Sequence, residues 1–192
     1  MIKNAQESTS TNTLYDADLS QDSCGVGFIT RKDSKQTHDV LVKSHEALCT
    51  IPHRGGMSAE GIGDGAGVNI DLSLNFFRKV TGITDLNLGD FGVANFFFPE
   101  DHAHYDSAAA QLVEAHFAEF NLPIIKWREV PVDNSVLNAA SVRAQLPIKQ
   151  VIFGRPAALK TASHEEFERH IQSALLTIEV EGFTRPELQG FY

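Results

Sequence analysis

Apolar residues recur along this chain with a period that alternates between that of strands and that of helices. The run GVGFIT at 25–30 predicts a strand, and Thr37 precedes a stretch whose apolar positions recur at helical spacing as far as Ile51. The same criteria predict further strands at 66–72, 91–98, 124–130 and 150–153, and helices at 74–80, 107–120 and 163–180. This alternation by itself favours a layered α/β domain with a doubly wound parallel sheet.

The first 23 residues differ in composition from the rest of the chain. They are rich in Ser, Thr, Asn and Asp and carry few large apolar side chains, so they cannot bury enough surface to offset the ordering of the chain. We therefore expect a propeptide or mobile leader over 1–23 and one domain over 24–192. The final stretch, GFTRPELQGFY at 182–192, ends like the beginning of another strand, so we expect this domain to be incomplete at its C-terminus.

Charge and cysteine content restrict the partners that this chain is expected to have. Sixteen basic and 25 acidic residues give a net charge of −9, and no basic cluster stands out along the sequence, which disfavours nucleic acid and anionic lipid as partners. Neither a signal peptide nor a long apolar segment is present, so we expect a cytoplasmic protein that does not interact with membranes. Its two cysteines are interpreted as two free thiols.

Cys24 is the first candidate for chemistry. It stands at the start of the predicted 25–30 strand, and Gly25, which has no side chain, would let a substrate approach the thiol closely. A catalytic role would require activation of the thiol, and a structural thiol is the alternative. Cys49 lies beside the apolar stripe of the predicted helix, so we interpret it as a small core residue without a catalytic role.

Two glycine-containing turns are further candidates. In PHRGG at 52–56, Gly55 or Gly56 would end the preceding helix, and Arg54 would favour the negative end of its dipole. In GIGDGAG at 61–67 a strand follows the glycines where a dinucleotide site would require a helix. We therefore predict a flexible or tightly turned loop whose backbone approaches a neighbour, with Asp64 as a turn residue or an orienter.

Two histidines, His102 and His104, raise the question of a metal site. They lack a third ligand at a sensible spacing in the sequence. We therefore predict a surface loop here and no metal site.

Taken together, these stretches resemble the beginning of the class II glutamine amidotransferase domain of glutamate synthases. The resemblance rests on order, spacing and loop type in DSCGVGFIT (22–30), HRGG (53–56), GDGAG (63–67) and NFFR (75–78), and it continues through WREVP (127–131) and PIKQVIF (147–153). The departures are mild: Ala59-Glu60 replaces a small residue followed by Asp, and Asn138 stands where the family usually has Gly. Neither departure touches Cys24.

The resemblance implies a fold and a nucleophile. The implied fold is α+β, the four-layer αββα sandwich of N-terminal nucleophile hydrolases, which replaces the parallel sheet suggested by element order. Removal of the leader would make Cys24 the first residue, and its freed α-amine would take the thiol proton. The thiolate would attack the side-chain amide of glutamine, and Gly25, Arg54, Gly55 and Asp64 would lie in the neighbourhood of the substrate.

The resemblance also implies what the complete enzyme would add. Ammonia would travel to an FMN-containing barrel and aminate 2-oxoglutarate, and both FMN and an iron–sulfur cluster would be bound outside this chain, which itself needs no cofactor. Expected partners are glutamine and the remainder of the glutamate synthase chain or a separate downstream subunit. The family's HxRFSTN stretch and Asn-Gly pair, which build the glutamine pocket and oxyanion hole, do not occur before Tyr192, so we expect this chain alone to be inactive. A non-catalytic stand-alone module or half of a split amidotransferase remain the alternatives.

Overall fold

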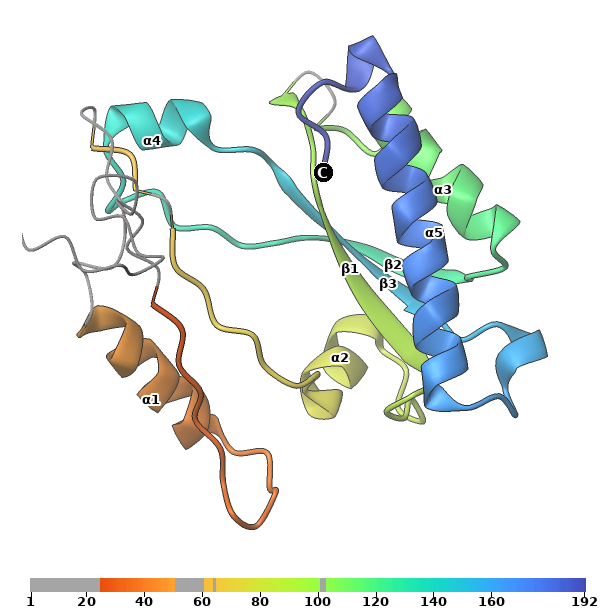
Figure 1. The fold of residues 1–192 in the computed structure, drawn as a ribbon, viewed down its shortest axis with the longest axis horizontal. Coiled ribbons are helices and arrows are strands. Elements are labelled where there is room, and N and C mark those ends of the chain that lie inside the picture. Colours follow the sequence, from red (N-terminus) through yellow and green to blue (C-terminus); the bar gives the residue numbers. More distant parts are fainter. Residues whose placement is uncertain (1–24, 51–60, 64, 101–102) are drawn as a thin grey trace, which may run out of the picture. The chain divides into compact units, whose positions relative to one another are not determined.

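The computed structural model describes residues 25–50, 61–63, 65–100 and 103–192 (Figure 1). The chain divides into two compact units, residues 1–69 and residues 70–192. Each unit is described by itself. Among the described residues, none of the helices combines the length and the apolar character that a bilayer-spanning segment requires.

The second unit is built on a three-stranded antiparallel sheet. Its strands are β1 (Phe91–Phe97), β2 (Ile124–Glu129) and β3 (Ile148–Gly154), in the order β1-β3-β2 (Figure 1). Along β3, Gln150 lies opposite Asn95 of β1 and Arg128 of β2. The predicted strand positions are confirmed, but the parallel sheet suggested by element order is wrong. Side-chain periodicity locates a strand without fixing its direction, and β3 runs antiparallel to both neighbours.

One face of the sheet is covered by two helices, α3 (Ala108–Glu119) and α5 (His164–Thr184). The buried core that they share with the sheet contains Ala94, Phe96, Phe98, Val113, Phe117, Val151, Phe153, Phe167, Ala174 and Ile178. Both helices begin where predicted, because each has a serine N-cap: the side chain of Ser107 accepts from the Ala110 N–H, and Ser163 forms a capping box with Glu166.

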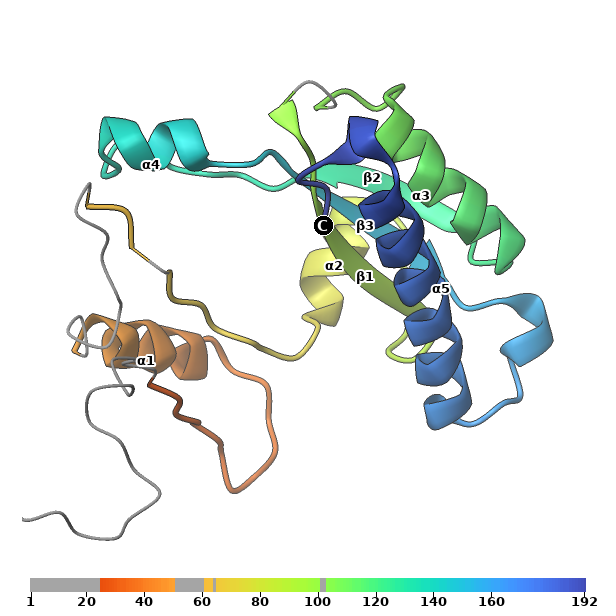
Figure 2. The same ribbon diagram turned by 45° about the horizontal axis from the view of Figure 1, so that its top comes forward.

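The opposite face of the sheet carries α2 (Leu74–Thr81), which is also confirmed from the sequence. Figure 2 shows this helix on the other side of the sheet from α3 and α5. It contributes Phe77 to a smaller buried cluster with Leu86, Phe91 and Ile152. Gly82, with φ of 78°, ends the helix in the left-handed conformation that favours glycine.

The described residues also contain short helical segments that were not predicted. They are α4 (Ala139–Ala144) and the 3-10 turns η3 (Ala157–Leu159) and η4 (Pro186–Leu188). The start of α4 has a local signal that could have been found, because Asn138 is a favoured N-cap residue and its side chain accepts from the Ser141 N–H.

The last residues of the chain pair with the edge of the sheet. Tyr192 and Phe97 exchange reciprocal backbone hydrogen bonds of 2.7 and 3.0 Å, the arrangement of an antiparallel ladder. Phe191 is buried beside them and stacks on Phe96. The prediction that this stretch begins a strand agrees with these bonds.

The first unit contains α1 (His38–Cys49), the helix predicted to begin after Thr37. The strands predicted at 25–30 and 66–72 are not formed in the described residues. Val26 is 100% exposed and Phe28 is 91% exposed, so the apolar side chains of the first stretch have no covering surface there. A strand needs a hydrogen-bonding neighbour, and periodicity in one segment does not supply it.

Candidate functional site

Most of the predicted site lies outside the described residues. Cys24, Arg54, Gly55 and Asp64 all belong to that part of the chain, and His102 does too. Gly25 is the first residue that the structure describes, and it is exposed in an irregular segment. The structure therefore describes residues that adjoin the predicted site residues in the sequence, but of those site residues it describes only Gly25.

The segment that follows Gly25 is anchored by an arginine at the turn before α1. Arg31 makes two hydrogen bonds to the Asp33 carboxylate, of 2.9 and 2.8 Å, and lies 3.7 Å from the carboxylate of Asp39 in the first turn of α1. Its guanidinium holds the pKa of Asp33 below the usual range of a carboxyl group. Both side chains are solvent-exposed, so this ion pair contributes little to the free energy of unfolding. Its main effect is to hold the turn between Arg31 and Asp33 in one conformation.

Two glycines of the loop at 61–67 adopt backbone conformations that favour glycine. Gly61 and Gly65 adopt φ values of 77° and 89°, which side-chain-bearing residues rarely adopt.

Cys49 is exposed, so its interpretation as a core residue is wrong. None of the described α1 side chains is buried, and the Cys49 thiol lies 3.9 Å from Nδ1 of His45, one helical turn earlier. The apolar stripe predicted a buried face for α1, but the described part of the chain provides no surface that buries it. Nothing in this contact gives Cys49 a catalytic role.

A buried lysine occupies the middle of the sheet within the PIKQVIF stretch. Lys149 is 5% exposed, forms an ion pair with Glu129 of β2 and lies 4.4 Å from the centre of the Tyr105 ring. Burial raises the pKa of Tyr105, and the nearby ammonium of Lys149 opposes that rise. The ammonium of Lys149 is thus paired with groups of the same unit. We therefore assign Lys149 a structural role in the sheet and no role in substrate binding.

A row of polar side chains crosses the opposite face of the sheet. Arg128 donates to the side-chain oxygen of Gln150 (3.1 Å), and the Gln150 amide donates to Asn95 (2.9 Å). Arg128 also lies 5.3 Å from the centre of the Phe76 ring of α2. The motifs WREVP and NFFR, which are far apart in the sequence, therefore meet in space.

A histidine joins the two covering helices. His116 of α3 is 8% exposed, and its ring nitrogens lie 3.0 Å from Glu119 and 2.6 Å from Glu181 of α5. Glu181 also pairs with Arg185. The sequence did not predict this cluster, because His116 and Glu181 are 65 residues apart.

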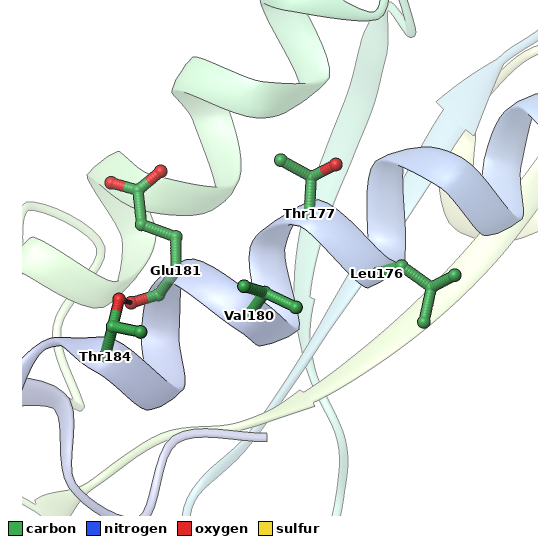
Figure 3. Close-up of a pocket in the computed structure, with 5 residues that line it drawn as sticks. All are labelled: Leu176, Thr177, Val180, Glu181 and Thr184. Carbon is green, nitrogen blue, oxygen red and sulfur yellow. Dashed lines mark hydrogen bonds between the residues drawn. The ribbon is translucent and has the colours of Figure 1, made fainter.

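A pocket on α5 offers no alternative catalytic site. It is lined by Leu176, Thr177, Val180, Glu181 and Thr184, all from one helix and its last turn (Figure 3). The hydroxyls of Thr177 and Thr184 both donate to backbone carbonyls of α5. Its one carboxylate is already engaged by His116 and Arg185.

The iron–sulfur cluster implied for the complete enzyme does not fit the residues of this chain. An iron–sulfur cluster normally takes four thiolates, and the sequence has two cysteines. Among the described residues, no group of three or more His, Cys, Asp and Glu side chains is arranged to hold a metal ion.

Comparison with known proteins identifies the family. Residues 24–192 match the family model of the class-II glutamine amidotransferases. The chain belongs to this family. The match begins at Cys24, the predicted nucleophile, and covers the whole of the predicted domain.

Similar proteins include several glutamate synthases. The chain is 32% identical over 145 residues to the NADH glutamate synthase of Saccharomyces cerevisiae, which covers 71% of this chain and 7% of that protein. It is 32% identical over 168 residues to the NADPH glutamate synthase large chain of Azospirillum brasilense (86% and 11%). It is also 32% identical over 147 residues to the ferredoxin-dependent glutamate synthase of Pyropia yezoensis (74% and 9%). The chain thus spans about a tenth of the length of these relatives. The resemblance predicted from the sequence is confirmed.

Proposed function

We propose that this chain is the N-terminal part of a glutaminase domain that supplies ammonia for glutamate synthesis from 2-oxoglutarate. The observation that carries the proposal is the family match, which starts at Cys24 and not at Met1. A boundary at this residue supports residues 1–23 as a propeptide and Cys24 as the first residue of the mature domain.

In the proposed reaction, the α-amine of the processed Cys24 takes the thiol proton, directly or through a water. This amine can act as the base because its reference pKa is about 8, so part of it is unprotonated at neutral pH. The thiolate attacks the side-chain carbonyl carbon of glutamine, the C–N bond breaks, and ammonia leaves with the proton. A γ-glutamyl thioester remains, and attack by water releases glutamate and restores the thiol. Arg54, Gly55, Gly25 and Asp64 are proposed to surround the substrate.

The described unit supports a sandwich fold without completing it. α3 and α5 cover one face of the antiparallel sheet, and α2 covers only part of the other, where Asn95 and Phe97 remain exposed. A second sheet packed on this free face would complete the proposed αββα sandwich.

Replacement of the nucleophile in the complete enzyme tests this proposal. Cys24→Ala should abolish glutamine-dependent glutamate synthesis and leave synthesis from added ammonia, because ammonia is used at a distant site. Cys49→Ala is the matched control and should retain both activities. If Cys24→Ala kept glutamine-dependent activity, or Cys49→Ala lost it, the assignment would be wrong.

N-terminal processing gives an independent test. Intact mass and N-terminal sequencing of the mature protein should find residues 1–23 removed and Cys24 first. A glutamine-active protein that retains Met1 would contradict the proposed base.

The alternative is a non-catalytic module or half of a split amidotransferase. The similar glutamate synthases are named for NADH, NADPH and ferredoxin, so their names favour no particular electron donor for a complete enzyme.

A cytoplasmic location stays a prediction.

A further inference from the structure

β2 is an edge strand whose outer backbone groups are open. Val130 donates its N–H to Ile148 of β3, and Arg128 pairs with Gln150, so these alternate residues direct their backbone groups toward β3. Trp127 and Glu129, which lie between them, direct their N–H and C=O groups away from the sheet. In the described part of the chain, no strand pairs with this side of β2.

Two cations lie along this edge on one face. Lys126 and Arg128 pair with Ile152 and Gln150 and are two residues apart, so their side chains share the face that carries α2. The Lys126 amine lies 2.7 Å from the carbonyl of Val80 in α2. This edge therefore carries two basic residues on one face, in a chain with a net charge of −9.

The charges of the two β2 cations are not neutralised locally. Within the described residues, no carboxylate lies within ion-pair distance of Lys126 or Arg128, whereas Lys149 and Arg185 of the same unit do have such partners. The hydrogen bond to Val80 uses one of the three ammonium donors of Lys126, and the bond to Gln150 uses one of the five guanidinium donors of Arg128. Both side chains therefore keep donors for an anionic partner.

We propose that the outer edge of β2 binds an extended protein segment that carries acidic side chains at two alternating positions. Such a segment would bond to the open backbone groups of Trp127 and Glu129 as an added strand. The residues opposite Lys126 and Arg128 would point to the same face as these cations, and directly opposite side chains in an antiparallel pair have Cβ atoms about 4.5–5.5 Å apart. The residue between them would lie beside Trp127 on the other face, where an apolar side chain fits. The preferred pattern is acidic, apolar, acidic.

The same charges argue against other occupants of this edge. A second copy of β2 added antiparallel would place cations opposite cations, which is unfavourable. Charged side chains on an open edge also discourage pairing with uncharged strands. The edge therefore selects for acidic segments, independently of the chemistry proposed for Cys24.

Peptide binding to the 192-residue chain tests the proposal. The probe is a fluorescent, end-capped peptide, Thr-Val-Thr-Glu-Val-Glu-Thr-Val-Thr, and its control carries Gln in place of both Glu. At low ionic strength, fluorescence anisotropy should show about tenfold tighter binding of the Glu peptide, an advantage that added salt reduces. Hydrogen exchange should slow at the amides of Trp127 and Glu129 when the Glu peptide is bound.

Two double variants with the same change in net charge complete the experiment. Lys126→Glu with Arg128→Glu should remove the advantage of the Glu peptide, whereas Lys160→Glu with Arg169→Glu, at exposed positions elsewhere, should keep it. Equal binding of both peptides, unchanged exchange at Trp127 and Glu129, or equal loss in both double variants would overturn the proposal. Because the comparison of the two peptides and the exchange measurement use the unmodified chain, misfolding of a variant leaves the test intact.

Discussion

Removal of the Arg155 guanidinium is expected to destabilise the second unit more than any other single change of an arginine in it. Arg155 directly follows β3 and donates four hydrogen bonds to backbone carbonyls: Leu159 (2.8 Å), Gly89 (3.2 Å), Ala162 (2.6 Å) and Ser163 (2.9 Å). It also lies 4.9 Å from the centre of the Phe167 ring. One side chain therefore joins the loop before β1, the loop after β3 and the start of α5.

The size of the effect follows from these contacts. A hydrogen bond to a charged group contributes about 1.5–3 kcal/mol when well buried, but Arg155 is only half-buried, so about 0.5–1 kcal/mol for each of the four bonds is appropriate. The contact with Phe167 adds about 0.5–1 kcal/mol. Arg155→Met, which keeps much of the aliphatic stem, should therefore lower the free energy of unfolding by about 3 kcal/mol. Arg155→Lys keeps the charge but cannot reach carbonyls in three directions, so we expect about half to two-thirds of that loss.

Urea denaturation of the purified 192-residue chain, followed by the fluorescence of Trp127, measures both changes. Arg169→Met is the matched control, because Arg169 is an exposed arginine of α5 without an ion pair in the described residues, and it should shift the free energy by less than about 0.5 kcal/mol. The reasoning would be refuted if Arg155→Met behaved like Arg169→Met, or if Arg155→Lys were as stable as the unmodified chain.

Three further predictions concern packing, pH and activity. In Gly92→Ala, the new Cβ would lie 2.7 Å from Cε2 of the buried Phe153 ring, which packs against Phe117, so thermal unfolding should occur at a clearly lower temperature than in Gly89→Ala, whose Cβ meets no neighbour but must adopt φ of 90°. The hydrogen bond from His116, and then that from Arg185, lowers the pKa of Glu181 below its ordinary 4.5. This stabilisation is complete above pH 4.5 and is lost as the pH falls through the lower folded-state pKa, so the stability difference between the unmodified chain and Glu181→Gln should shrink in urea titrations at acidic pH. A difference that stays constant from pH 7 to pH 3 would contradict this assignment. The purified 192-residue chain should release no measurable glutamate from glutamine, because the resemblance assigns the oxyanion donors to motifs that these residues do not contain, and loss of one such donor alone costs about 10²–10³-fold in rate.

Local signals in this sequence predicted local structure well. α3 and α5 begin where predicted because Ser107 and Ser163 hydrogen-bond within their own first turns, so the deciding interactions lie within three residues. Short apolar runs likewise located β1, β2 and β3. In each case the information lies within the segment itself.

Predictions that depended on distant partners were less successful. Val26 and Phe28 have the alternation of a strand, but a strand forms only beside another strand, and the described residues provide none for them. Cys49 has the position of a core residue on α1, yet burial depends on a covering surface. Element order by itself also indicated the wrong sheet direction, because it does not show that β3 lies between β1 and β2 and runs antiparallel to both.

The candidate site shows the same division. Cys24 and Gly25 were found from a short motif and from its resemblance to a family, and the family match begins at that cysteine. The β2 cations were missed, because only the strand pairing shows that β2 is an edge strand and that Lys126 and Arg128 share one of its faces. Charge counted along the sequence gave −9 and indicated no basic surface. The sheet nevertheless places these two cations on one face of its edge strand.

The polar row on the free face of the sheet connects the observed unit with the proposed sandwich. A second sheet packed on this face would take Asn95 and Gln150 out of water, and burial of an amide is costly unless its hydrogen bonds are made. Arg128 already donates to Gln150, and Gln150 donates to Asn95, so much of the hydrogen bonding of these side chains is satisfied within the sheet. Phe97, on the same face, is 40% exposed and would contribute apolar area to such an interface. This part of the face therefore offers apolar surface to bury, and its two amide side chains already hydrogen-bond to each other.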